Sequence, residues 1–154
     1  MKNISILALY LFIFTMFKSL AISSSDILGE YEFSDPDTGS TARVKIFERE
    51  NKTNIFDVRI IWSEDMYDEH GKMRLDINNP DEKLRDLPVN QILMIKGLKF
   101  NEEEKRWESD YFYHPIWGKT FDVYMSLESS TKLKVHVFWK RPIYGKSAYW
   151  TKIK

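Results

Sequence analysis

The chain has 154 residues, a length that favours a single domain. Its 23 basic and 23 acidic residues balance, so it lacks the basic excess that nucleic-acid-binding proteins usually show. It contains no cysteine, which excludes disulfides, thiol chemistry and thiolate-bound metals.

The amino-terminal residues predict an export signal. Lys2 supplies a positive charge, a nearly unbroken apolar run extends from Ile4 to Phe17, and small residues surround Leu20 in Ser19-Leu20-Ala21. This order is typical of a signal peptide. The run is shorter than the ~20 residues that cross a bilayer, so a retained membrane anchor is the less favoured alternative. We expect cleavage after Ala21 and a single exported domain, residues 22–154, that is periplasmic or secreted.

Beyond the export segment, apolar and polar residues alternate with a period of two. In residues 120–127, for example, Phe121, Val123, Met125 and Leu127 alternate with polar residues or tyrosine. Such alternation predicts half-buried strands. We predict eight strands, at about 28–34, 41–49, 54–62, 89–99, 105–113, 119–127, 132–140 and 147–153.

Short connections join most of these strands, and Asp35-Pro36-Asp37-Thr38-Gly39 is a strong turn sequence. Sequential strands with tight turns predict an antiparallel meander. The expected fold is therefore all-β, an eight-stranded up-and-down antiparallel β-barrel, because closure removes exposed sheet edges. A β-sandwich is the alternative.

One connection, from Ser63 to Pro88, is long and polar, with eight acidic and four basic residues. Long loops in compact domains are often functional or disordered. Within it, Pro80–Leu87 predicts a helical turn capped by Asn79. The acids lack the spacing of a calcium loop, so a solvated loop is the preferred interpretation.

Aromatic residues are abundant, with five tryptophans and eight tyrosines. An eight-stranded barrel is wide enough either to be filled by side chains or to hold one small ligand. These rings therefore either fill the barrel or line an apolar pocket at its mouth. The candidate ligand-binding rings are Trp62, Tyr113, Trp117 and Tyr124.

The sequence shows no arrangement of nucleophile and base, so we predict neither a catalytic set nor a cofactor. The histidines, His70, His114 and His136, lie in different predicted elements without metal-ligand spacing, and no metal site is predicted. The carboxylates Glu108, Asp110 and Asp122 come from adjacent strands. Cross-strand charge pairing explains them best, and an active site there is the less favoured interpretation.

Several short motifs occur in a characteristic order, among them Gly29-Glu30-Tyr31, Asp37-Thr38-Gly39, Leu75–Pro80, Tyr113–Phe121 and Tyr149-Trp150-Thr151. Over about residues 28–153 the chain resembles the exported bacterial family called domain of unknown function 2147. That resemblance implies a small exported β-barrel and no particular activity. At the level of fold alone, the sequence is also similar to lipocalin-like and avidin-like barrels.

The leading functional hypothesis is a binding module for a small apolar or amphipathic ligand, gated by the loop from Ser63 to Pro88. The alternative is an envelope protein-interaction module with a filled barrel, whose surfaces would be the acidic loop and the apolar turn Ile116-Trp117. No nucleic-acid partner is expected, and no membrane span is expected after cleavage.

Overall fold

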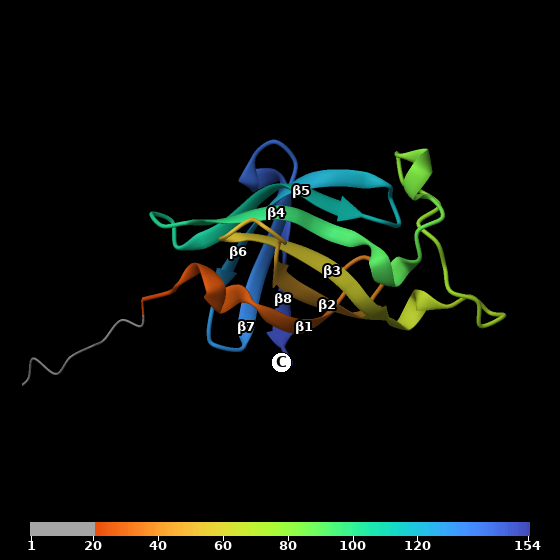
Figure 1. The fold of residues 1–154 in the computed structure, drawn as a ribbon, viewed down its shortest axis with the longest axis horizontal. Helices are drawn as coiled ribbons and strands as arrows, with labels where there is room; N and C mark the ends of the chain where they lie inside the picture. Colours follow the sequence, from red (N-terminus) through yellow and green to blue (C-terminus); the bar gives the residue numbers. More distant parts are fainter. Residues whose placement is uncertain (1–20) are drawn as a thin grey trace, which may run out of the picture.

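A computed structural model describes residues 21–154. The predicted export segment, apart from Ala21, lies outside the described residues. Eight strands form a closed barrel in which each strand pairs antiparallel with the next and β8 returns to β1, so the predicted barrel is confirmed and the sandwich is not (Figure 1). The strands are β1 (Gly29–Ser34), β2 (Thr41–Glu48), β3 (Ile55–Ser63), β4 (Leu93–Asn101), β5 (Arg106–His114), β6 (Lys119–Leu127), β7 (Lys132–Phe138) and β8 (Gly145–Lys152).

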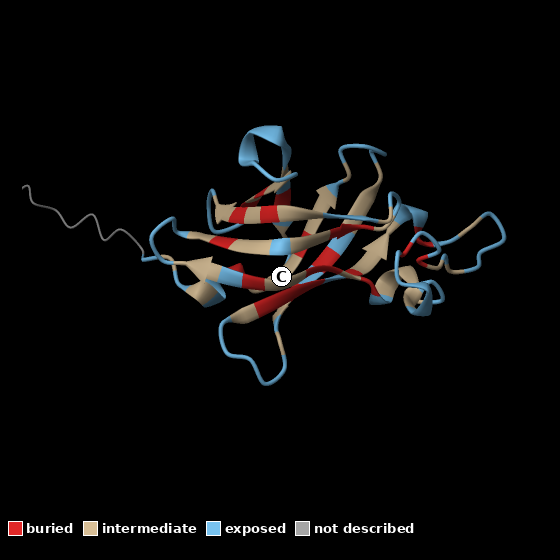
Figure 2. Ribbon diagram, turned by 90° about the horizontal axis from the view of Figure 1, so that it is seen from above, coloured by how far each residue is buried: buried red, intermediate tan, exposed pale blue. Residues whose placement is uncertain are grey.

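The barrel interior follows from the alternation in the sequence. In β2, Val44 and Ile46 are buried, while Arg43 and Lys45 between them are exposed. Buried positions recur along the other strands, and most of the connecting loops are exposed (Figure 2). Among residues 21–154, no helix has the length and apolar character needed to cross a bilayer.

One end of the barrel is plugged. The short 3-10 helix η2 (Ser24–Ile27) precedes β1 and buries Ile27. Two interior rings hold it by hydrogen bonds to its backbone: Nε1 of Trp107 donates to the Ser24 carbonyl at 2.9 Å, and the Tyr31 hydroxyl donates to the Ile27 carbonyl at 2.9 Å. Large rings therefore fill this end and satisfy the carbonyls of the plug.

β-bulges change which residues face inward, and besides the register shifts between β3 and β4 two of them lie beside predicted site residues. The pairing of β2 with β3 shifts at Arg43/Val44, so that Arg43 lies opposite Trp62. The pairing of β5 with β6 shifts between Ser109 and Phe112. Because one extra residue exchanges the two faces of a strand, a simple alternation cannot be extended through either position.

The structure corrects several predicted boundaries. β4 begins at Leu93 rather than near residue 89, because Pro88 is followed by the 3-10 helix η5 (Val89–Gln91). β7 ends at Phe138 and β8 begins at Gly145, since η6 (Pro142–Tyr144) occupies the connection between them.

The helical turn predicted over Pro80–Leu87 is shorter than expected. It is the 3-10 helix η4 (Glu82–Leu84), and its cap is Asp81, whose side chain accepts a hydrogen bond from Lys83 N. The side-chain oxygen of Asn79 instead accepts a hydrogen bond from the backbone N of Asp81, the capping residue itself. The preceding 3-10 helix is η3 (Glu64–Met66).

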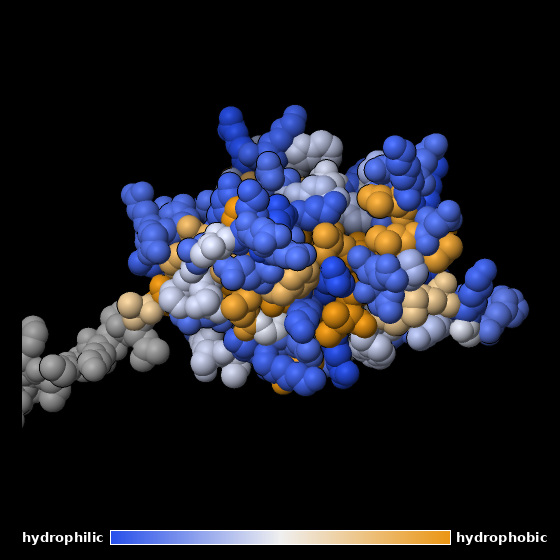
Figure 3. Space-filling model, viewed as in Figure 1, coloured by the Kyte–Doolittle hydropathy of each residue, from blue (hydrophilic) through white to orange (hydrophobic). Residues whose placement is uncertain are grey.

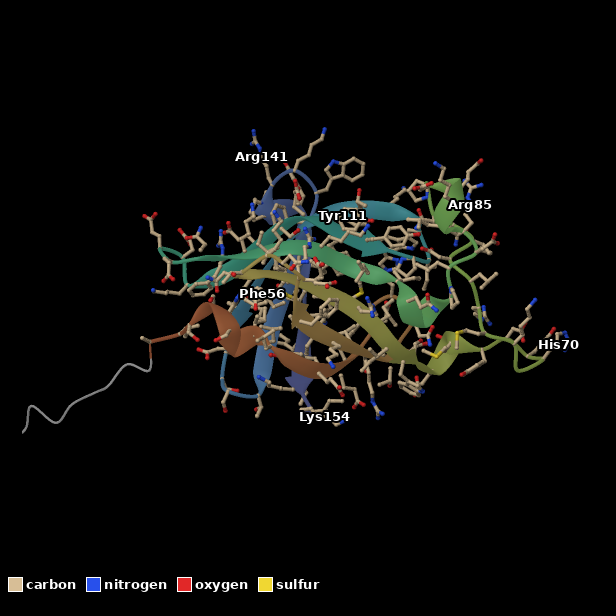
Figure 4. The ribbon with its side chains drawn as sticks, in the orientation of Figure 1. Phe56, His70, Arg85, Tyr111, Arg141 and Lys154 are labelled. Carbon is tan, nitrogen blue, oxygen red and sulfur yellow. The ribbon has the colours of Figure 1, made fainter. Side chains whose placement is uncertain are left out.

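The long connection between β3 and β4 leaves the end of the barrel opposite the plug (Figure 1). Its base packs on the barrel: Asp76 is buried and accepts hydrogen bonds from the Tyr113 hydroxyl at 2.6 Å and from Nδ2 of Asn79 at 2.7 Å. His70, at its tip, points away from the barrel (Figure 4). The connection is therefore anchored at its base and solvated at its tip.

Candidate functional site

The end of the barrel opposite η2 is hollow. A cavity of about 900 Å³ runs from the barrel interior to the surface. Its inner wall carries apolar side chains from strands all round the barrel: Phe33, Ala42, Ile60, Met94, Phe112, Phe121, Val135, Val137 and Trp150. The barrel is thus filled at the plugged end and empty at the other.

Trp150 separates the filled and hollow parts. Its ring is buried and stacks on Phe33 with 4.7 Å between the ring centroids and 15° between their planes. Tyr31 also packs against it, with the centroids 6.4 Å apart. The cavity therefore rests on aromatic side chains that pack into the filled end.

The cavity mouth is rimmed by exposed apolar side chains from three connections. Ile77 belongs to the long connection, Ile116 to the β5–β6 turn, and Ile143 and Tyr144 to the β7–β8 connection, and all line the opening. Ile143 is 82% exposed and Ile116 is 53% exposed. Apolar side chains gather on this half of the molecule in the space-filling view (Figure 3).

Polar groups lie among these apolar residues. Asp35 and Asp37 come from the β1–β2 turn, and His114 is the last residue of β5. Nε2 of His114 lies 3.9 Å from Oδ2 of Asp35 and 3.8 Å from Oδ2 of Asp37. Nζ of Lys146, from the start of β8, lies 3.4 Å from Oδ1 of Asp37.

The imidazole of His114 is held in place by packing. Trp117 stacks on it with a centroid distance of 4.3 Å and an interplanar angle of 13°. Burial lowers the pKa of His114, and the nearby Asp35 and Asp37 carboxylates only partly oppose that effect.

Of the four rings predicted for a ligand site, the structure brings one to the cavity. Trp117 is 48% exposed and lines the mouth. Tyr113 is buried, and its hydroxyl donates a hydrogen bond to Asp76 of the long connection. Burial, strengthened by Asp76, raises the pKa of the Tyr113 phenol.

The other two rings are on the outer surface of the barrel. Trp62 lies beneath the Arg43 guanidinium, 4.9 Å from it, because the bulge places it opposite that exposed residue. Tyr124 stacks on His136 at 4.8 Å and lies 4.5 Å from the Arg106 guanidinium. Neither ring is among the side chains that line the cavity.

The carboxylates Glu108, Asp110 and Asp122 line a separate, shallow depression on the outer face of β4, β5 and β6. Oε1 of Glu108 accepts a hydrogen bond from Nε of Arg106 at 2.7 Å. Both residues belong to β5, so this half-buried ion pair runs along one strand and is not the expected cross-strand pair. Some acids of the long connection are local acceptors: Oδ1 of Asp68 accepts from His70 N and Lys72 N. Others tie the connection to the barrel, since Glu64 accepts from Thr41 N.

Sequence reasoning missed most of the cavity wall, including Phe33, Phe112 and Trp150. Trp150 follows the alternation of β8 and could have been assigned inward from its pattern alone. Phe112 could not, because the bulge in β5 reverses the alternation just before it. Asp35, Asp37 and His114 carried no spacing signal, since only the closed barrel brings the β1–β2 turn to the end of β5.

An eight-stranded up-and-down barrel with one plugged end and one open cavity defines a lipocalin-like protein. The chain belongs to the bacterial family described as "Uncharacterized protein conserved in bacteria (DUF2147)", which residues 29–152 match. It is similar in structure to protein HP1028 from Helicobacter pylori, which is described as belonging to the lipocalin family. The TM-score is 0.67, with 22% sequence identity over 82% of each chain. At that identity the likeness concerns the fold alone. A search of curated proteins found no match.

Proposed function

We propose that the protein binds one small apolar or amphipathic molecule in the barrel cavity. The observation that carries the proposal is the hollow end itself, because a cavity of about 900 Å³ with apolar walls is large enough for a small organic ligand. Burial of the ligand's apolar body would supply most of the binding free energy. The polar groups at the mouth suit a ligand whose polar end stays near solvent.

The export signal predicted at the amino terminus supports a role outside the cytoplasm. In that compartment the protein would carry or sequester a poorly soluble molecule. Fractionation of the producing cells should recover the protein outside the cytoplasm with a mass that begins at Ile22. Recovery of the full-length chain in the cytoplasm would contradict this placement.

Variants of Ala42 test the proposal. Ala42 lies on β2 and lines the cavity, so Ala42→Val, Ala42→Leu and Ala42→Phe should fill progressively more of it. We expect the affinity for a fluorescent fatty-acid probe, titrated into delipidated protein, to fall in that order and to drop at least about tenfold for Ala42→Phe.

The matched control is Lys45→Phe, which adds the same ring at an exposed position of the same strand. It should leave the affinity unchanged. Either of two outcomes would contradict the proposal: the wild-type protein shows no saturable binding of apolar probes, or Ala42→Phe binds them as well as the wild type.

The exposed rim favours a second candidate, an interaction module of the cell envelope. Ile77, Ile116, Ile143 and Tyr144 are all exposed around one opening, and exposed apolar groups that cluster often mark interaction sites. In that case Ile116→Ser with Ile143→Ser should abolish a stoichiometric complex with a partner protein while probe binding in the cavity persists. If this double substitution instead weakens probe binding and no stoichiometric complex with a partner protein is found, the first candidate is favoured.

A further inference from the structure

A group of three side chains at the cavity mouth has the geometry of an ion site. The donor atoms of Asp35, Asp37 and His114 all lie within 4.8 Å of one another, and within residues 21–154 this is the one such group of three. The two carboxylate oxygens lie 3.8 and 3.9 Å from Nε2 of His114. These separations are too long for hydrogen bonds, so the atoms surround a common point without bonding to each other.

Each carboxylate is oriented by its other oxygen. Oδ1 of Asp35 accepts hydrogen bonds from Asp37 N at 2.8 Å and from Thr38 N at 2.9 Å, which closes the β1–β2 turn. Oδ1 of Asp37 is the atom that faces Nζ of Lys146. In both residues Oδ2 is left directed at His114. Such supporting bonds fix the direction of metal ligands in proteins.

His114 supplies an independent observation. The residue is 9% exposed, and its Nδ1 is buried without a hydrogen-bond partner among the described residues. The recorded polar contacts of its Nε2 are the two carboxylate oxygens that stand beyond bonding distance. Buried polar atoms of a native protein normally have a partner, protein or otherwise. Nε2, the nitrogen that faces the two oriented carboxylates, has no hydrogen-bond partner within residues 21–154, and a group bound among the three side chains would give it one. Nδ1 is a different ring atom and would not be satisfied by that group.

We propose that Asp35, Asp37 and His114 bind a single divalent metal ion of the zinc class at the mouth of the cavity. One imidazole nitrogen with two carboxylate oxygens suits zinc better than calcium or magnesium, which prefer oxygen ligands alone. Two carboxylates against one lysine leave a net negative charge that attracts a dication.

The observed spacing requires little rearrangement. Ligands held at about 2.1 Å from a tetrahedral zinc ion lie about 3.4 Å apart, so each carboxylate oxygen needs to approach Nε2 of His114 by only a few tenths of an ångström from the observed 3.8 and 3.9 Å. Three protein ligands leave a fourth position open, as in zinc sites that bind an exogenous group. Because all three residues line the cavity, that position is available to the polar end of a molecule inside it.

The test is titration of the full chain, stripped with a chelator, with Zn²⁺ by calorimetry and with Co²⁺ by visible absorption. We expect one ion per chain and a Co²⁺ spectrum of low coordination number. His114→Ala, Asp35→Asn and Asp37→Asn should each weaken the affinity at least about tenfold, as loss of one ligand usually does. Asp35→Asn keeps the side-chain oxygen that closes the turn, so it should fold normally.

Two control variants identify nonspecific binding. Asp65→Asn removes another acid at the same mouth, and His70→Ala removes an exposed histidine beside Glu69; neither should change the affinity. Binding that is absent, substoichiometric or insensitive to His114→Ala would overturn the proposal. The Ala42→Phe variant should still bind the ion, so failure of the metal site and failure of cavity binding can be told apart.

Discussion

Individual side chains decide how the plugged end is sealed. Tyr31 is fully buried, and its hydroxyl donates to the Ile27 carbonyl of η2. Burial raises the pKa of Tyr31 to about 12, whereas a tyrosine in the unfolded chain titrates near about 10. The folded protein therefore holds this proton more tightly than the unfolded chain does.

The first prediction concerns this tyrosine at high pH. Because its folded-state pKa is raised, its contribution to stability is fully present below about pH 10 and is lost as the pH rises toward 12. The free energy of unfolding, measured by urea titration across this window, should fall more steeply for the wild type than for Tyr31→Phe. Equal slopes would show that Tyr31 titrates normally. Tyr144→Phe, at an exposed position, should leave the slope as in the wild type.

The second prediction concerns the buried pair that anchors the long connection. Asp76→Ala leaves the Tyr113 hydroxyl without its acceptor and should cost about 2–3 kcal/mol, because a buried donor loses its partner. Tyr113→Phe should cost a similar amount, because it leaves the buried Asp76 carboxylate with the Asn79 amide as its remaining side-chain donor. The double variant should lie well below the sum of the two, as measured by denaturant unfolding. Strict additivity would mean that the bond contributes nothing to stability.

The positions of some residues at the mouth could be predicted from local sequence patterns, and those of others could not. Trp117 could be placed there because its turn is apolar where turns are usually polar. Trp62 could not be located, because the bulge at Arg43/Val44 has no clear sequence marker and reverses the strand's faces. The grouping of Asp35 and Asp37 with His114 depends on how a closed barrel brings distant turns together, which local patterns do not specify.

At the scale of elements, turns and docked connections shape the cavity mouth. The β5–β6 turn passes so close to the long connection that a Cβ on Gly118 would collide with the Asn78 carbonyl. Nδ2 of Asn78 in turn donates to the Ile116 carbonyl at 3.0 Å. These contacts fix one side of the opening to the base of the long connection.

The third prediction compares two glycines with similar backbone angles. Gly118 has φ of +60° and Gly71 has φ of +72°, but Gly71 has open space around its would-be Cβ. Alanine at either position adds about 1–2 kcal/mol of backbone strain. Gly118→Ala should lose about 1–3 kcal/mol more in unfolding free energy, because its methyl group displaces a backbone segment. It should also speed amide exchange at Ile116–Gly118 and Asn78.

Equal losses in the two variants would show that the turn and the long connection do not pack as described.

The strand order itself was predictable, since short polar turns join alternating runs. The element boundary at Leu93 was not, because the 3-10 helix after Pro88 interrupts a sequence that reads as strand.

At the scale of the whole molecule, the barrel divides into two functional halves. One half is a packed core closed by η2, which supplies stability without a disulfide. The other half is a cavity whose mouth carries apolar side chains, two aspartates and a buried histidine. The mouth also holds Lys146 and half-exposed Trp139, and Arg141 projects from the adjoining connection into solvent (Figure 4).

This division explains why composition alone left the interior undecided. The five tryptophans are distributed over both halves and the outer surface: Trp107 fills the plugged end, Trp150 lies between the halves, and Trp62 is on the outside. A count of rings cannot distinguish these positions. Only the register of the strands, with its bulges, assigns each ring to a side.

The most direct test of the central claim is native mass spectrometry of the protein purified gently from its own cells, wild type beside Ala42→Phe. Ligand binding in the cavity predicts a discrete added mass on the wild type that is released on activation in the gas phase and is absent from Ala42→Phe. It is contradicted if the wild type carries no added mass, or if both proteins carry the same one.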